Sequence, residues 1–282
     1  MPHQRLGDEF MLNSILIALS VVATVGLCAG IMLALASHFF SVPENQTAKL
    51  VRECLPGANC GACGYAGCDD YAKAVAENNA PINLCIPGGG DTSSAISEIV
   101  GGEAGNTEKK VAFVNCNGNC NAAAHKAQYE GISSCKAESM IYGGSLACRF
   151  GCLGKGDCAD VCPVDAICVT DDVARIDINK CIGCGLCVKT CPKNLISLVP
   201  VKANALVMCN NKEKGASARK NCKNACIGCK KCELNCPEKA IKVENNLAVI
   251  DFEKCTGCKI CVENCPTKCI KAFDFSSGKI GV

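Results

Sequence analysis

Cysteine is the residue with which this chain can do most of its chemistry, and it accounts for 29 of the 282 residues. When the sequence is shifted by 74 residues, nine cysteines coincide with nine others. Packing alone does not require such a match. A duplicated metal-binding unit does, because the metal fixes the ligand positions while the intervening residues can change. The matched cysteines are Cys135, Cys148, Cys152, Cys158, Cys162, Cys181, Cys184, Cys187 and Cys191 in the first copy, and Cys209, Cys222, Cys226, Cys232, Cys236, Cys255, Cys258, Cys261 and Cys265 in the second.

The second copy contains the pattern C-x2-C-x2-C-x3-C-P twice. Three thiolates at this spacing wrap around one four-iron cluster, and the cysteine before proline crosses to the other cluster. Zinc sites use two C-x2-C pairs and do not need this crossing, so zinc is disfavoured here. The predicted ligand sets are Cys226, Cys229 and Cys232 with Cys265, and Cys255, Cys258 and Cys261 with Cys236.

The first copy has the same second half but a changed first half. Its second half predicts that Cys181, Cys184 and Cys187 share a cluster with Cys162. In its first half, Lys155 occupies the position of Cys229, so one ligand must come from elsewhere. Cys148 is the nearest candidate, and a three-iron cluster with only three ligands is the alternative. The predicted set is Cys148, Cys152 and Cys158 with Cys191.

A different motif precedes the repeats, with the spacing C-x2-C-x4-C-x16-C. Glycines between its first three cysteines let backbone amides approach a cluster. This motif predicts one [4Fe-4S] cluster held by Cys60, Cys63, Cys68 and Cys85, with a structural zinc site as the alternative. These motifs together predict five [4Fe-4S] clusters.

The remaining cysteines predict a sixth cluster whose four ligands the spacing does not single out, with free thiols as the alternative. The candidates are Cys116, Cys120, Cys135, Cys209 and Cys222. Symmetry pairs Cys135 with Cys148 and Cys209 with Cys222, which conflicts with Cys148 as the substitute ligand. Cys54, Cys168 and Cys269 have no evident partners, and we expect them to be buried.

The amino-terminal part of the chain predicts a membrane anchor. Residues 10–43 contain no Asp, Glu, Lys or Arg, and this stretch exceeds the roughly 20 residues that a helix needs to cross a bilayer. A cleaved signal peptide is the alternative, but clustered thiolates require a reducing compartment. Arg5 on one side, with Lys49 and Arg52 on the other, favours a cytoplasmic location for the carboxy-terminal side.

The predicted organisation is α+β. It comprises a short tail (1–9), a single transmembrane helix (10–43), a small α-helical single-cluster domain (44–86), a flexible glycine-rich linker (87–109) and two tandem bacterial-ferredoxin-like units of βαββαβ type (110–200 and 201–282). Apolar runs predict strands at 111–114, 174–178, 205–208 and 247–251. Because proline suits the first helical position, we expect the Cys-Pro steps to open short helices.

Charge is unevenly distributed although the net charge is only +2. Residues 202–239 hold nine Lys and Arg against three Asp and Glu. This stretch predicts a docking surface for an acidic redox partner, with a solvated face as the alternative. No recognition motif accompanies it, which disfavours nucleic-acid binding.

The segment from Cys60 to Cys68, placed after one apolar span and before ferredoxin-type motifs, resembles the B subunit of the Rnf complex, the ion-translocating ferredoxin:NAD oxidoreductase of bacterial and some archaeal membranes. The resemblance covers nearly the whole chain, including the ending Cys265-Pro266-Thr267-Lys268-Cys269. Shorter family members carry one two-cluster unit, whereas this chain has two.

The resemblance implies a membrane-anchored subunit of a hetero-oligomeric translocase that relays electrons from reduced ferredoxin through its clusters to integral-membrane partners. It places flavins and the NAD site in other subunits, so this chain has no complete active site of its own. The implied location is the inner membrane, with the iron–sulfur domains on the cytoplasmic side. An iron–sulfur subunit of another membrane or corrinoid-linked oxidoreductase, and a zinc-stabilised scaffold, are the alternatives.

Overall fold

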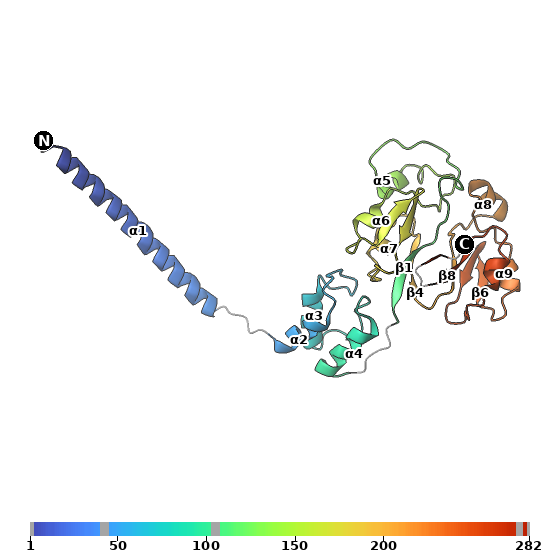
Figure 1. Cartoon of the computed structure of the whole chain (residues 1–282), viewed down its shortest axis with the longest axis horizontal. Helices are drawn as coiled ribbons and strands as arrows, with labels where there is room; N and C mark the ends of the chain where they lie inside the picture. The colour runs from blue at the N-terminus through green and yellow to red at the C-terminus, as the bar shows by residue number, and fades with distance from the viewer. Residues whose placement is uncertain (1–2, 40–44, 103–107, 275–278, 281–282) are drawn as a thin grey trace. The chain divides into compact units, whose positions relative to one another are not determined.

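The computed structural model describes residues 3–39, 45–102, 108–274 and 279–280 (Figure 1). The chain divides into two units, residues 1–45 and 46–282. The first unit is essentially one helix, α1 (His3–Phe39), so the predicted tail is already helical from His3. Its segment Leu19–Ser37 has a mean hydropathy of 2.3 and is long enough to cross a membrane. Residues 40–43 of the predicted span lie outside the described residues.

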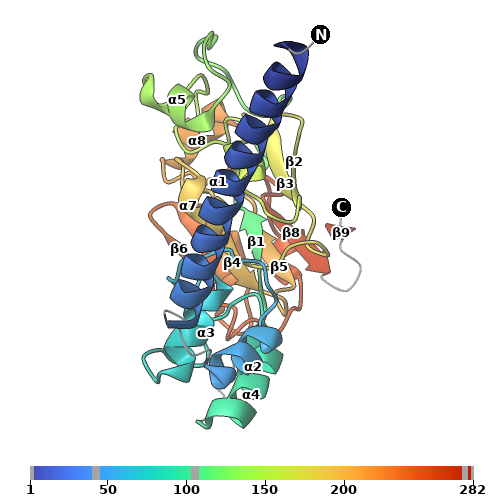
Figure 2. The same ribbon diagram turned by 90° about the vertical axis from the view of Figure 1, so that its left-hand side faces the viewer.

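The second unit begins with three helices: α2 (Gln46–Cys54), α3 (Cys68–Ala76) and α4 (Gly89–Val100). Helix α2 packs against both α3 and α4, and Figure 2 shows the three gathered together. Their shared core includes the fully buried side chains of Val51, Tyr71, Val75 and Ile96. These helices and the loop between α2 and α3 position the first cysteine motif.

Helix α4 corrects the prediction of a flexible linker at 87–109. Residues 89–100 are helical, and Ile96 is 0% exposed because it packs into the core of the three-helix domain. Glycine and serine made this segment resemble a tether, but isoleucines spaced along it form an apolar face. Residues 103–107 lie outside the described part of the chain.

Each repeat that follows contains two antiparallel strand pairs and three short helices. In the first repeat, the strands are β1 (Lys110–Val114) paired with β4 (Ile196–Pro200), and β2 (Ile167–Thr170) paired with β3 (Val173–Ile176). Its helices are α5 (Cys135–Met140), α6 (Asp157–Asp160) and α7 (Leu186–Thr190).

The second repeat has the same plan. Its strands are β5 (Ala205–Val207) paired with β8 (Ile270–Asp274), and β6 (Ile241–Glu244) paired with β7 (Leu247–Ile250). Its helices are α8 (Gly215–Asn221), α9 (Lys231–Leu234) and α10 (Ile260–Glu263), and a short strand β9 (Lys279–Ile280) pairs with β8. All four predicted strands are present, with small shifts at their ends. The mixed helix-and-strand architecture with one amino-terminal apolar helix is therefore confirmed.

The two repeats pack against each other through an apolar cluster. Val111, Phe113 and Val199 of the first repeat lie with Leu206, Met208 and Phe273 of the second. The rings of Phe113 and Phe273 meet edge to face, with centroids 6.0 Å apart. This contact holds the cysteines of one repeat close to those of the other.

The Cys-Pro steps form turns, so the prediction that they open helices is wrong. In each, the N–H three residues after the cysteine donates to the cysteine carbonyl, for example from Asn194 to Cys191 at 3.1 Å and from Lys268 to Cys265 at 3.1 Å. The donating residue adopts the left-handed conformation, with φ of 50° at Asn194 and 51° at Lys268. Proline is equally suited to the second position of such a turn.

Candidate metal centres

Twenty-four of the 29 cysteines gather in six groups of four, which we call sites A to F in the order in which they adjoin one another. Site A is Cys60, Cys63, Cys68 and Cys85; site B is Cys162, Cys181, Cys184 and Cys187; site C is Cys135, Cys152, Cys158 and Cys191. Site D is Cys116, Cys148, Cys209 and Cys222; site E is Cys226, Cys229, Cys232 and Cys265; site F is Cys236, Cys255, Cys258 and Cys261.

The first three cysteines of site A lie on the loop between α2 and α3 and at the start of α3. The backbone N–H of Cys68 donates to Asn59 at 2.9 Å, which folds the loop over the helix end. Cys85 is brought in by buried Tyr71, whose hydroxyl donates to Pro81 at 2.7 Å and accepts from the N–H of Leu84 at 3.2 Å. Burial, followed by the charges of the other three thiols, raises the pKa of Cys85. The predicted four cysteines are therefore neighbours.

Sites B, E and F bring together the cysteines predicted for them. In site B, burial and then the three neighbouring thiols raise the pKa of Cys187 to about 12. The four cysteines of site E line one small cavity, and those of site F line another. The cavities at sites E and F leave space between the sulfurs, where a cluster would lie.

Site C differs from the predicted set, because Cys135 replaces Cys148. Cys135, Cys152, Cys158 and Cys191 line one cavity, whereas Cys148 lines another. Burial and then the thiols of Cys152, Cys135 and Cys191 raise the pKa of Cys158 to about 12. The chain therefore offers site C four cysteines, which leaves no need for a three-ligand cluster.

Asp157 holds Cys135 at site C across 22 residues of sequence. Its carboxylate accepts hydrogen bonds from the N–H of Cys135 at 2.7 Å, the N–H of Lys136 at 3.0 Å and the Ser134 hydroxyl at 2.9 Å. Although partial burial acts in the opposite direction, these bonds hold the pKa of Asp157 below its ordinary value. Position 231 of the second repeat, equivalent to Asp157, is lysine, so that repeat has no such clamp.

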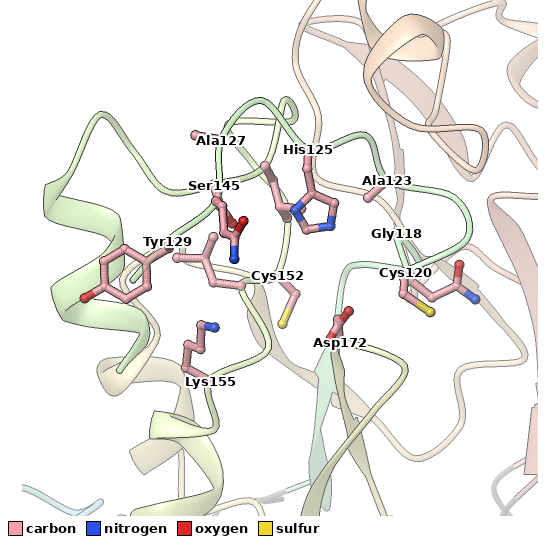
Figure 3. Close-up of a pocket in the computed structure, with 14 residues that line it drawn as sticks. Gly118, Cys120, Ala123, His125, Ala127, Tyr129, Ser145, Cys152, Lys155 and Asp172 are labelled. Atoms are coloured by element: carbon pink, nitrogen blue, oxygen red, sulfur yellow. The ribbon is translucent and has the colours of Figure 1, made fainter. Parts of the chain in front are cut away.

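Lys155, which replaces a cysteine of the second repeat, points into a polar pocket of about 220 Å³ that Cys152 also lines (Figure 3). Its ammonium group lies 3.7 Å from a carboxylate oxygen of Glu138, which is 1% exposed, and 5.8 Å from the centre of the Tyr129 ring. The other carboxylate oxygen accepts from the N–H and hydroxyl of Ser145 at 2.9 and 2.6 Å. Lys155 thus compensates a buried carboxylate.

Site D lies between the two repeats. Cys116 and Cys148 come from the first repeat, Cys209 and Cys222 come from the second, and all four line one cavity. Gly118 passes so close that a side chain there would meet the sulfur of Cys222 at 3.3 Å. Of the five candidates for a sixth cluster, Cys116, Cys209 and Cys222 are here, Cys135 is in site C, and exposed Cys120 is in neither.

Backbone and side-chain N–H groups are directed at the sulfurs throughout these sites. At site D, Cys209 accepts from the N–H of Asn211 at 3.4 Å and of Cys226 at 3.2 Å, and Cys148 accepts from the buried Asn211 amide at 3.5 Å. In each Cys-Pro turn the next N–H along the chain points at the cysteine, as from Ala240 to Cys236 at 3.3 Å. Such bonds stabilise negative charge on thiolate-bound clusters.

Neighbouring sites adjoin one another. The thiols of Cys60 in site A and Cys184 in site B are close enough for their charges to interact, and so are those of Cys116 in site D and Cys152 in site C. The N–H of Cys226, in site E, donates directly to Cys209 of site D. Site D therefore connects the two repeats.

Five cysteines stand outside the sites: Cys28, Cys54, Cys120, Cys168 and Cys269. Of the three expected to be buried, Cys269 is buried, Cys54 is half-buried and Cys168 is exposed. The Cys269 sulfur lies 3.6 Å from that of Cys265 and also lines the cavity of site E. Hydrogen bonding from Cys269 lowers the pKa of both Cys265 and Cys226.

Comparison with known protein families supports iron–sulfur chemistry. Residues 55–87 match a putative Fe-S cluster family, residues 174–197 a 4Fe-4S binding domain and residues 225–272 a 4Fe-4S dicluster domain. These matched segments contain all of sites A, E and F and three of the four cysteines of site B.

Relatives match over most of the chain, and each is the B subunit of its complex. The chain is 47% identical to that of the Na(+)-translocating ferredoxin:NAD(+) oxidoreductase complex of Acetobacterium woodii, over 86% of this chain and 74% of the relative. It is 41% identical to the proton-translocating counterpart of Clostridium ljungdahlii, over 85% of each. It is also 38% identical to that of the ion-translocating oxidoreductase complex of Methanosarcina acetivorans, over 86% and 93%.

The chain belongs to the Rnf B-subunit family. It is a membrane-associated iron–sulfur electron-transfer subunit of an ion-translocating oxidoreductase, as the resemblance of its motifs implied. The sequence analysis considered Cys135 for a sixth cluster and did not group it with site C, and it did not identify all four cysteines of site D. Lys155 nevertheless marked the position at which the repeat symmetry fails.

Proposed function

We propose that sites A to F each hold one [4Fe-4S] cluster, with the four cysteines of each site as ligands. The support is that each set gathers four thiols and that the sets of sites C to F each line a cavity. Clusters bound there would carry single electrons. The six sets use 24 cysteines, and Cys269 remains a fifth, non-ligating thiol beside site E.

Site D is the observation that carries the proposal of a continuous relay. Site A lies in the three-helix domain, and sites B and C lie in the first repeat. Without site D, no site would link these three to sites E and F of the second repeat. The shared apolar cluster keeps the repeats together, and the N–H of Cys226 links sites D and E directly. The order A–B–C–D–E–F then gives one path along the second unit.

The partners follow from the family. Relatives are named as subunits of ferredoxin:NAD(+) oxidoreductases, so we assign reduced ferredoxin as the electron donor and membrane subunits of the same hetero-oligomeric complex as acceptors. The anchor α1 precedes the domain of site A, which makes site A the exit and the second repeat the entrance. Arg5 before the apolar span, with Lys49 and Arg52 after it, supports a single-pass anchor whose carboxy-terminal unit is cytoplasmic.

The relay is tested in membranes that contain the whole complex. Cys222→Ser removes a site D thiol that no other site uses, and ferredoxin-dependent NAD reduction should fall at least tenfold while reduction of the chain by dithionite persists. Cys120→Ser changes an exposed cysteine outside every site and should leave the rate unaltered. Wild-type turnover in Cys222→Ser membranes would contradict the relay.

A further inference from the structure

The second repeat places lysine at four backbone positions that disfavour it. Lys230, Lys239, Lys259 and Lys268 all have positive φ, between 51° and 62°. Residues other than glycine, asparagine and aspartate rarely adopt this left-handed conformation, because their Cβ atom approaches the following carbonyl oxygen. The only other described residue of this kind, outside Gly, Asn and Asp, is Tyr142.

The first repeat shows what the fold itself requires at these positions. The four equivalent residues, 74 earlier in the chain, are Gly156, Asp165, Gly185 and Asn194, and they have the same positive φ. Two of these positions precede short helices, and two close Cys-Pro turns and direct the next N–H at a cysteine. The conformation is therefore needed for the sites, but lysine is not.

All four lysines are exposed, and none forms an ion pair within the described part of the chain. Lys202 and Lys254, by contrast, are paired with nearby carboxylates. Residues 201–282 hold fifteen Lys and Arg against eight Asp and Glu, whereas residues 110–200 hold nine against eight. The unfavourable backbone positions therefore add unpaired positive charge to one repeat only.

Two of the lysines also adjoin the most exposed cysteines of the six sites. Cys229 of site E and Cys258 of site F are the only exposed cysteines among the six sites, and each is followed directly by one of these lysines. Helices α9 and α10, which Lys230 and Lys259 precede, contact each other, and α9 carries Leu234, which is 81% exposed. Lys230 lies one helical turn before Leu234, and positive charge beside an exposed apolar side chain suits a small, transient interface with an acidic protein.

We propose that Lys230, Lys239, Lys259 and Lys268 form the docking surface for a small acidic ferredoxin, which delivers electrons to sites E and F beside Cys229 and Cys258. This inference rests on the proposed function and locates its entrance. It differs from the broader prediction from residues 202–239, because Arg219, Lys220, Lys223 and Lys231 are not part of the surface. Lys259 and Lys268 lie beyond that stretch.

The test replaces the four lysines by residues that the left-handed conformation favours: Lys230→Gly, Lys239→Asn, Lys259→Gly and Lys268→Asn. The control variant, Lys212→Asn, Lys214→Asn, Lys220→Asn and Lys223→Asn, removes the same charge from exposed positions elsewhere in the repeat. Reduction of the full-length chain in detergent by reduced ferredoxin is followed by stopped flow at several salt concentrations, with dithionite as the small reductant for comparison.

We expect the first variant to keep its iron and its reduction by dithionite. Its second-order rate constant with ferredoxin should fall about tenfold or more at low salt, with a weaker salt dependence. The control should lose less than threefold. Equal losses in both variants would overturn the proposal, because the rate would then depend on the overall charge of the repeat. Wild-type rates in the first variant would also overturn it. Failure of ferredoxin to reduce the wild-type chain would instead refute the proposed function.

Discussion

At the scale of single residues, the replacement of one cysteine by Lys155 decides how the neighbouring thiols are shared. In the second repeat, Cys229 completes site E, so Cys209 is free to join site D. In the first repeat, Lys155 cannot serve as a thiolate ligand, and Cys135, the counterpart of Cys209, completes site C. The two copies therefore use equivalent cysteines for different sites.

This exchange predicts separate effects for two nearby cysteines. Cys135→Ser should remove iron from site C, and Cys148→Ser should remove it from site D, because each thiol lines only its own cavity. Low-temperature EPR of the reduced full-length chain, with iron analysis, distinguishes the two losses. Loss of the same signal in both variants would show that Cys135 and Cys148 serve one site. Cys120→Ser is the control.

Cys269 predicts a change in reduction potential without a change in iron. Its thiol lies 3.6 Å from the Cys265 sulfur, and hydrogen bonding to Cys226 and Cys265 keeps it protonated by raising its pKa. Because a donated hydrogen bond stabilises the more negative reduced state, Cys269→Ala should shift the site E midpoint to a more negative potential.

An EPR-monitored redox titration measures that shift, with Cys168→Ala at an exposed position as the control. If Cys269→Ala retains its iron and the midpoint potential of site E is unaltered, Cys269 does not tune that potential. Loss of about four irons would identify Cys269 as a ligand.

At the scale of elements, the sequence predicts those strands and cysteine sets that depend on a short apolar run or on local cysteine spacing. The four strands and the sets at sites A, B, E and F follow from local patterns. Site D and the position of Cys135 depend on contacts between distant segments, such as the Asp157 clamp on α5. Local spacing contains no signal for a carboxylate that accepts from an N–H 22 residues away.

Helix α4 gives a prediction at this scale. Because Ile96 is completely buried against α2 and α3, Ile96→Ala should destabilise the domain of residues 46–102 by about 2–5 kcal/mol. Thermal unfolding followed by loss of the site A absorbance measures the effect, with Glu98→Ala on the exposed face as the control. An unchanged melting temperature would restore the linker hypothesis for this segment.

At the scale of the whole molecule, cysteines take the place of much of a conventional core. The chain has no Trp, and only 4% of its residues are aromatic. Cysteines contribute to the cores of both repeats, among small side chains such as Ala112 and Ala248. The two repeats thus rest on cores rich in cysteine and on the apolar contact between them.

Iron content per full-length chain tests this account most directly. Six four-iron sites predict about 24 irons and an equal amount of acid-labile sulfide, falling to about 20 in Cys222→Ser. About 20 irons in the wild-type chain, with no change on Cys222→Ser, would contradict site D and the relay that it completes.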